Sequence, residues 1–292
     1  MKNQADSLHR FIFENTPIRG ERVHLDAAWK NVLARHDYPP VLQQMLGELA
    51  AAAVLLAATL KLDGALILQI QGTGSIKLLV VECDGEMHMR ATAKWEGELN
   101  GTLPDLVGEG HFVITLAPKN GKQAYQGIVA LEGATISDIL QNYMTRSEQL
   151  ETRLWLAADG QAAAGMLLQK MPEQDNDQDD DTWSRVTQLA ATLRGDELMQ
   201  LPTQELLHRL FNEDDVRLFE HEPVSFLCSC TRDKVSQMLR MLGEDEVDTI
   251  LTERSAIEVY CEFCNECYTF DKVDAVQLFA SAAPMITSAT RH

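Results

Sequence analysis

Six cysteines are the residues of this chain that could do chemistry most readily, and five of them lie within its last 65 positions. Four form a C-x-C pair and a C-x-x-C pair separated by thirty residues: Cys228, Cys230, Cys261 and Cys264. A structural zinc ion takes four ligands in a tetrahedron, with each sulfur at ~2.3 Å, and two close pairs can meet that geometry with little strain. The sequence therefore predicts one zinc ion per chain, bound by these four thiolates.

Such a site has two interpretations, a permanent structural staple or a switch. Zinc holds cysteine as thiolate, which is the form that oxidants attack. Oxidation to disulfides removes the ligands, and a small domain folded by zinc then loses the free energy that held it together. The spacing of the cysteines leaves both interpretations open.

Cys267 extends the second pair to C-x-x-C-x-x-C. It could replace Cys264 as a ligand, act as a resolving thiol, or simply pack, and we expect a bystander. Cys83 stands alone on a predicted strand, where a small core residue is expected. His221 is close to Cys228 in sequence, but we expect a surface residue there rather than a ligand.

No motif in the chain nominates a catalytic site. Neither G-x-S-x-G nor H-E-x-x-H occurs, and Gly72-x-Gly74 lacks the third glycine and the following helix of a nucleotide-binding loop. The many carboxylates are expected to be solvated faces, with no pair standing out as acid and base. We therefore expect a protein that is not an enzyme.

The net charge of −19 argues against nucleic acid or an anionic membrane as a partner, because both favour basic surfaces. The N-terminal residues are polar and show no secretory h-region. The longest apolar run, Leu49–Leu60, is shorter than the ~20 residues that span a bilayer, and we expect a buried helix there. A cytoplasmic protein is the expectation.

The charge divides the chain into three regions. Residues 1–172 carry a net charge of −4, residues 173–222 carry −10, and the remainder carries −5. We predict an N-terminal domain over residues 1–172, an acidic amphipathic helical linker over 173–227, and a zinc-binding switch domain over 228–292.

Alternating apolar residues in the first region predict strands, and pairs such as Asp84-Gly85 and Asn120-Gly121 predict hairpin turns between them. The expected strands cover residues 10–15, 65–71, 76–82, 87–95, 111–116, 123–131, 153–158 and 165–171. The expected helices cover residues 26–36, with Asp26 as the N-cap, residues 40–63 and residues 135–148. Since many strands follow one another in hairpins, we expect an α+β fold whose N-terminal domain is largely antiparallel.

The linker combines the acidic run EQDNDQDDD with two apolar stripes at helical spacing. The first stripe begins at Trp183 and ends at Leu193, and the second runs from Leu206 to Phe211 after Pro202. Crowded carboxylates repel one another and weaken the folded form, so the linker should be only marginally stable. The last region predicts short helices over 232–242, 246–251 and 272–280, and small strands over 257–260 and 268–270. Its core is meagre, so a metal is a sensible stabiliser.

At the level of longer motifs, the sequence resembles the 33 kDa chaperonin family, the redox-regulated heat-shock holdases of bacteria. The resemblance runs over essentially the whole chain and rests on LHRFIFEN, HDYPPVLQQMLGELAAAAVLLAATLKLDG, LQIQGTGSIKLLVVECDGEMHMRATA, YQGIVALEGATISDIL, NYMTRSEQL, GMLLQKMP and the cysteine pairs.

The resemblance implies an ATP-independent chaperone that is inactive when reduced and zinc-bound. Oxidation would form disulfides within the neighbouring pairs, here Cys228–Cys230 and Cys261–Cys264, and would expel zinc. The zinc domain and linker would then unfold, and the exposed surface would bind unfolding client proteins. Activated members tend to form homodimers. Cys267 departs from the four-cysteine pattern and leaves the pairing in the second cluster less certain.

Two other functions compete with the redox-switched holdase. One is a zinc-stapled interaction or regulatory protein with a fixed partner, and the other is a thiol oxidoreductase. Apolar stripes flanked by acids favour the holdase, because exposing them creates an adhesive surface while the charge keeps the complex soluble. An oxidoreductase would be expected to place its C-x-x-C at a helix start in a βαβ setting, whereas Cys261 follows a strand-like run.

Overall fold

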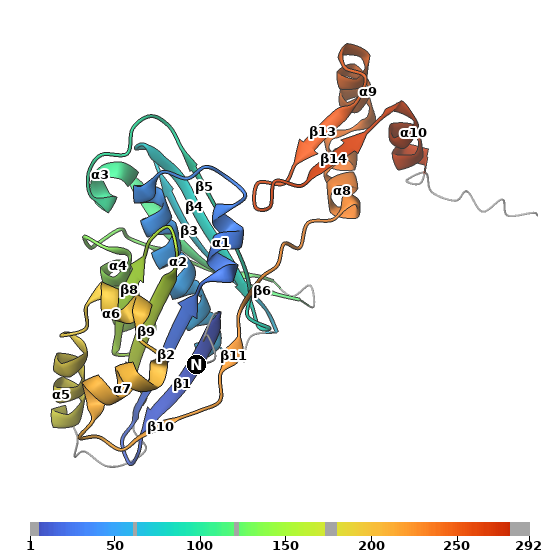
Figure 1. Ribbon diagram of the computed structural model, residues 1–292. Helices are drawn as coiled ribbons and strands as arrows, with labels where there is room; N and C mark the ends of the chain where they lie inside the picture. The colour runs from blue at the N-terminus through green and yellow to red at the C-terminus, as the bar shows by residue number, and fades with distance from the viewer. Residues whose placement is uncertain (1–5, 61–62, 120–122, 173–179, 281–292) are drawn as a thin grey trace, which may run out of the picture. The chain divides into compact units, whose positions relative to one another are not determined.

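The computed structural model describes residues 6–60, 63–119, 123–172 and 180–280. The chain divides into two compact units, Met1–Leu227 and Cys228–His292, so the division falls directly before the first cysteine of the cluster (Figure 1). The predicted turn at Asn120-Gly121 and most of the acidic run lie outside the described residues. The separation of the first unit into an N-terminal domain and a linker stays a prediction.

Helix α2, Pro40–Thr59, forms the centre of the first unit. It is apolar on nearly all sides, with every residue from Leu49 to Ala57 buried, and such a helix must lie inside a core. Strands of two sheets pack against it. Among the described residues, it is the one helix long and apolar enough to cross a membrane, but 67% of that stretch is buried within the protein. It is therefore a core helix, as the sequence predicts.

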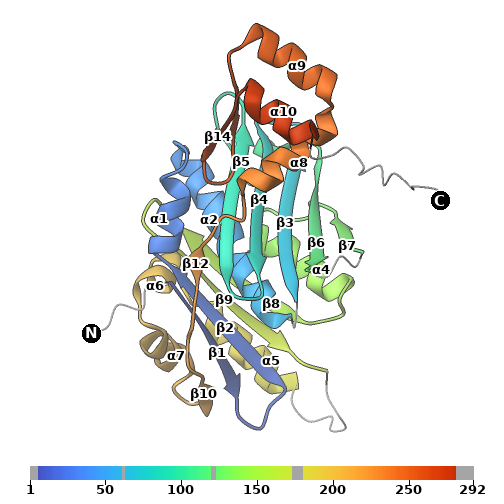
Figure 2. The same cartoon turned by 90° about the vertical axis from the view of Figure 1, so that its right-hand side faces the viewer.

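Two six-stranded sheets enclose α2 (Figure 2). The first has the order β10-β1-β2-β9-β8, with β11 also paired to β1, and consists of β1 (Ser7–Phe13), β2 (Ile18–Leu25), β8 (Thr152–Ala158), β9 (Ala163–Lys170), β10 (Val216–Leu218) and β11 (Glu222–Pro223). The second has the order β12-β5-β4-β3-β6-β7 and consists of β3 (Gly64–Gly72), β4 (Ile76–Asp84), β5 (His88–Trp95), β6 (Gly110–Pro118), β7 (Tyr125–Val129) and β12 (Ser225–Phe226). Among the described residues, every strand pairing in this unit is antiparallel except that of β12 with β5. The predicted α+β, largely antiparallel fold is confirmed.

Strand β2 is the main element of the core that the sequence pattern did not predict. Its sequence, IRGERVHL, has charged residues at Arg19, Glu21 and Arg22, a pattern that does not alternate as in a half-buried strand. Even so, Glu21 and Arg22 are only 2% and 1% exposed. The strand is covered on both faces, and its charged side chains find partners inside the protein. A polar pattern at such a position therefore resembles a surface loop when only the sequence is known.

Helix α1, Ala27–Leu33, is shorter than predicted, and its N-terminus is capped in a different way. Asp26 occupies the N-cap position but makes no side-chain cap hydrogen bond. The carboxylate of Asp6 instead accepts hydrogen bonds from the amides of Asp26, Ala27 and Ala28, at 2.7 to 3.1 Å. The predicted N-cap position of Asp26 is confirmed, but the capping carboxylate belongs to a residue twenty positions earlier. The other helices of this region are α3 (Leu103–Val107) and α4 (Ile136–Arg146).

Three helices cover the face of the first sheet that α2 does not contact (Figure 1). They are α5 (Asp180–Ala190), α6 (Gly195–Gln200) and α7 (Thr203–Phe211). Both apolar stripes predicted in the linker point at this sheet, because Trp183, Leu206 and Phe211 are buried in one cluster with sheet residues such as Phe13 and Met166. The predicted linker, residues 173–227, is thus helical in its described part up to Phe211. Its last part is not helical as predicted, because it forms the short strands β10, β11 and β12, which pair with the two sheets.

The described part of the second unit contains helices α8, α9 and α10 and a two-stranded hairpin, close to the elements predicted. Their bounds are α8 (Arg232–Leu242), α9 (Glu244–Glu253), β13 (Ile257–Tyr260), β14 (Cys267–Phe270) and α10 (Lys272–Ala280). Seven buried side chains make the core: Leu239, Val247, Leu251, Ile257, Phe270, Ala275 and Leu278. A core of this size supplies little stability by itself, so an additional stabiliser is expected.

Candidate metal and redox centre

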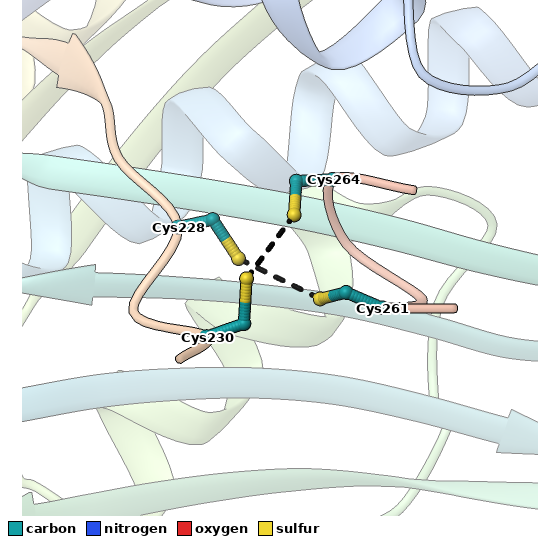
Figure 3. Close-up of side chains that lie close together, drawn as sticks. All are labelled: Cys228, Cys230, Cys261 and Cys264. Carbon is teal, nitrogen blue, oxygen red and sulfur yellow. Dashed lines mark hydrogen bonds between the residues drawn. The ribbon is translucent and has the colours of Figure 1, made fainter. Parts of the chain in front are cut away.

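The four predicted cysteines converge in the second unit, with their side chains pointing toward one another (Figure 3). All four sulfurs lie within 4.8 Å of one another. The sulfurs of Cys228 and Cys261 are 3.7 Å apart, and those of Cys230 and Cys264 are 3.3 Å apart. Each of these short contacts joins one pair to the other, so the cluster ties together two segments that are thirty residues apart.

The first pair is held by the start of helix α8. Thr231 caps this helix by accepting a hydrogen bond from the amide of Lys234, and the Lys234 ammonium donates to the carbonyl of Ser229 at 2.6 Å. The ammonium thereby fixes the residue that separates Cys228 from Cys230. Helix α8 begins at Arg232, two residues after Cys230, so the positive end of its dipole lies close to this pair, where it favours a thiolate.

The second pair is held by a tight turn after strand β13. The amide of Asn265 donates to the carbonyl of Cys261 at 2.8 Å, and the amide of Cys261 donates to the carbonyl of Glu266 at 2.9 Å. Asn265 closes the turn with a φ of 58°, a left-handed conformation that asparagine tolerates better than most residues. The turn brings the sulfurs of Cys261 and Cys264 to the same side.

Two residues that the sequence did not nominate connect the halves of the site. Tyr268 donates its hydroxyl to Cys230 Sγ at 3.2 Å. Arg232 stacks on the ring of Phe270 at 4.2 Å, pairs with Asp274 at 2.9 Å and donates to the carbonyl of Thr269. No sequence signal marks these roles, because they depend on the register of the β13–β14 hairpin.

The thiols of Cys230 and Cys264 resist ionisation when no cation is present. Burial raises the pKa of Cys230, although the Tyr268 hydroxyl opposes this shift. Burial also raises the pKa of Cys264, and the three neighbouring cysteines raise it further. Four thiolates cannot share so small a volume unless a cation balances their charge. Metal binding at this site must therefore release protons.

The arrangement fits a tetrahedral metal with thiolate ligands. Zinc–sulfur bonds of ~2.3 Å in a regular tetrahedron place the sulfurs about 3.8 Å apart, which is close to the two measured contacts. Two pairs from separate segments supply the four ligands, and all four residues are partly buried rather than on an open surface. The donor set is soft, which suits zinc far better than magnesium or calcium.

Cys267 lies outside this group of four. It is exposed at the start of β14, with its sulfur 3.9 Å from Thr269 Oγ1, and it raises the pKa of the Tyr260 hydroxyl to about 12. Cys83 is fully buried in the core around α2. The ring of His221 lies 5.6 Å from that of His9, on the first sheet, and so belongs to the other unit.

Comparison with known proteins places these observations in a family. A family model described as "Hsp33 protein" matches residues 6–271. The "33 kDa chaperonin" of Methylobacillus flagellatus is 57% identical over 290 residues, and that of Chromobacterium violaceum is 52% identical over 293 residues, each alignment covering 99% of both chains. A crystal structure of the 33 kDa chaperonin from Thermotoga maritima superposes with a TM-score of 0.82 at 19% identity, covering 95% of this chain and 99% of that one.

The class of protein is thus a chaperone with a four-cysteine centre able to hold a metal ion. The chain belongs to the Hsp33 family, as the resemblance of its sequence motifs indicates.

Proposed function

We propose that this protein is a redox-regulated, ATP-independent holdase whose reduced, zinc-bound form is inactive. The observation that carries the proposal is the convergence of four cysteine sulfurs within 4.8 Å, contributed by two segments of a unit with a seven-residue apolar core. The cysteines are at once the ligands that stabilise this unit and the groups that an oxidant attacks. One chemical event can therefore remove the main support of the fold.

Zinc, when bound, would hold the cysteines as thiolates and contribute folding free energy on the order of 10 kcal/mol. Oxidation by a peroxide turns two thiols into one disulfide, with two electrons and two protons passing to the peroxide, which leaves as two waters. Disulfides at Cys228–Cys230 and Cys261–Cys264 would consume all four ligands. Such short loops return little stability, because loop-closure gains shrink with loop length. The second unit should therefore open as its ligands are oxidised, and these disulfides should keep it open.

We expect the disulfide partners to be decided after the zinc ligands are lost and the second unit has opened. In the folded unit the shortest contacts are between pairs, Cys228 with Cys261 and Cys230 with Cys264. Disulfides at these contacts would fasten the two segments together and keep the unit closed. Once the unit opens, the cysteines nearest in sequence meet most often, since the entropy of closing a loop rises with its length. Pairing within each motif is the outcome that commits the unit to the unfolded form.

The linker is attached to the first sheet in a way that allows release from its C-terminal end. Between Phe211 and Cys228, the chain is held by strands of only three, two and two residues. The last of them, Ser225–Phe226, pairs with β5 of the second sheet, and a single residue separates it from the start of the second unit at Cys228. Unfolding that begins at Cys228 would first reach these short pairings and then the helices α5, α6 and α7.

Release of the linker would uncover two apolar surfaces that now face each other. The helices would expose residues such as Trp183 and Phe211, and the sheet would expose Phe11 and Met166. Contiguous apolar surface of this kind binds other proteins, and the linker's acidic residues would keep the complexes soluble. We propose unfolding proteins as the clients and a homodimer as the activated form.

The test is light scattering from a model protein that aggregates on dilution from denaturant. The reduced, zinc-loaded protein should leave the aggregation unchanged, and the oxidised, zinc-free protein should suppress it at near-stoichiometric amounts. Returning reductant and zinc should restore the inactive form. Equal suppression by both forms would reduce the cysteine cluster to a permanent staple, and suppression by neither would favour a zinc-stapled protein with one fixed partner.

A further inference from the structure

A cluster of basic side chains is buried between the first sheet and the linker, far in sequence from the cysteines. Arg22 is 1% exposed and donates to Thr203 Oγ1 at 2.8 Å, to the carbonyl of Leu198 at 2.9 Å and to that of Leu201 at 2.6 Å. The guanidinium therefore joins β2 to the end of α6 and the start of α7. Its charge has no carboxylate partner among these contacts.

Two histidines flank this guanidinium on the same face of the sheet. His9, which is 5% exposed on β1, has its Nδ1 3.2 Å from Thr203 Oγ1. His24 on β2 has its Nε2 2.9 Å from the carbonyl of Met199, while its buried Nδ1 has no hydrogen-bond partner. The His9 ring thus contacts a residue that Arg22 binds, Thr203, whereas the His24 ring contacts Met199, next to the Leu198 that Arg22 binds. Both contacts lie around the turn between α6 and α7.

We propose that His9 and His24 form an acid-sensitive latch, whose protonation releases helices α6 and α7 from the sheet while the cysteines stay reduced. The inference rests on the proposed function only for the consequence of linker release, which is the binding of client proteins. The latch itself is a property of the first unit. It gives the linker a second trigger, independent of thiol chemistry.

The charges around the histidines set the direction of the effect. Burial, Arg22 and His221 lower the pKa of His9 to about 4. Burial and Arg22 lower the pKa of His24, opposed by the Met199 carbonyl and by Asp26 and Asp6. The docked linker therefore favours neutral histidines. Once the linker leaves, water reaches both rings, and their pKa values return toward the ordinary ~6.5.

Linkage gives the sign and the size of the response. A histidine whose pKa is lowered in the docked form stabilises docking fully above pH ~6.5, and this contribution is lost as pH falls toward the docked value. For a shift from ~6.5 to about 4, docking at pH 5 weakens on the order of 30-fold through His9 alone. His24 acts in the same direction.

On the opposite face of strand β2, a fall in pH has the opposite effect on stability. Glu21 lies on the face of the strand opposite to Arg22, beside Arg10. Burial raises its pKa to about 7 despite the nearby charges of Arg19 and Arg10, and the charge of Glu222 adds to this rise. Protonation of Glu21 relieves a buried charge in the sheet. A fall in pH should therefore loosen the linker without dismantling the sheet beneath it.

The experiment measures hydrogen exchange of residues 195–211 in the full-length, reduced, zinc-loaded protein between pH 7.5 and 5. Each rate is divided by that of the denatured chain at the same pH, and bound zinc and free thiols are counted in every sample. Protection should fall at least tenfold by pH 5 while zinc remains stoichiometric. The double variant His9→Gln/His24→Gln should lose most of this pH dependence, and each single variant should lose part of it. The exposed His208 on α7 supplies the matched control, His208→Gln, which should behave as the parent protein.

Constant protection down to pH 5, loss of protection only after zinc has left, or an equal loss in the double variant would each overturn the latch. If the linker of the double variant is already undocked at pH 7.5, the latch is judged from the pH dependence of protection in the two single variants and in the parent protein. The same exchange measured after oxidation at pH 7.5 separates the two ideas. Release by oxidant but not by acid contradicts only the latch, whereas release by acid but not by oxidant contradicts only the redox switch.

Discussion

Arg22 of strand β2 and Thr203 of helix α7 are joined by a buried hydrogen bond of 2.8 Å across 181 residues of sequence. The same guanidinium serves the carbonyls of Leu198 and Leu201, so one side chain satisfies three polar groups at the turn between two linker helices. Groups of this kind are costly to leave without a partner in a buried interface. The linker is thus held by a specific polar contact as well as by apolar packing.

Arg22→Met should loosen the linker even when every cysteine is reduced. The substitution keeps an apolar side chain but removes the hydrogen bonds to two carbonyls and to the Thr203 hydroxyl, which costs the docked linker about 3 kcal/mol. The reduced variant should suppress aggregation of a model client in light scattering. Arg146→Met, which removes an exposed ion pair with Glu132 in the same unit, is the matched control and should stay inactive. An inert Arg22→Met protein with a fully protected linker would show that this contact does not hold the linker.

Disulfide mapping of the oxidised protein should find Cys228–Cys230 and Cys261–Cys264. Peptide mass spectrometry without reduction distinguishes these from the crossed pairs Cys228–Cys261 and Cys230–Cys264, which match the shortest sulfur contacts of the folded unit. Crossed pairs in a fully active sample would mean that the unit is oxidised while folded, and the proposed order of opening and pairing would be wrong.

Cys267→Ser should retain one zinc per chain and full oxidative activation, because Cys267 is exposed and lies outside the four-sulfur group. The matched change, Cys264→Ser, removes a sulfur 3.3 Å from Cys230 and should weaken zinc binding severely. Metal analysis of both reduced proteins gives the comparison. A loss of half the zinc or more from Cys267→Ser would assign it a ligand role.

The sequence predicted those features that depend on local pattern. Helix α2 was evident from its long apolar run, and the cysteine cluster from its spacing, because the run is continuous and each cysteine pair lies within one turn of chain. Strand β2 was not predicted, since its buried Arg22 looks like a surface residue until the linker is seen to cover it. Its binding partners lie more than 170 positions away.

The same limit applies at the metal centre. Four ligand candidates could be chosen from the sequence, but the contact of Tyr268 with Cys230 requires the hairpin register that sets Val259 opposite Tyr268. The acidic linker was predicted to be amphipathic, and most of its residues buried against the first sheet lie on the predicted stripes, whereas Leu198 of α6 lies outside them. Which surface those stripes cover could not be predicted, because the sheet is assembled from strands at both ends of the first unit.

Hydrogen exchange of residues 183–211 in reduced and oxidised protein tests the central claim most directly. In the reduced, zinc-loaded form these residues should be protected, because their apolar side chains are buried against the first sheet. In the oxidised, zinc-free form the same residues should exchange close to the rate of an unfolded chain, while helix α2 keeps its protection in the core. Equal protection of residues 183–211 in the two forms would contradict the account, since the linker would then remain docked whatever the state of the cysteines.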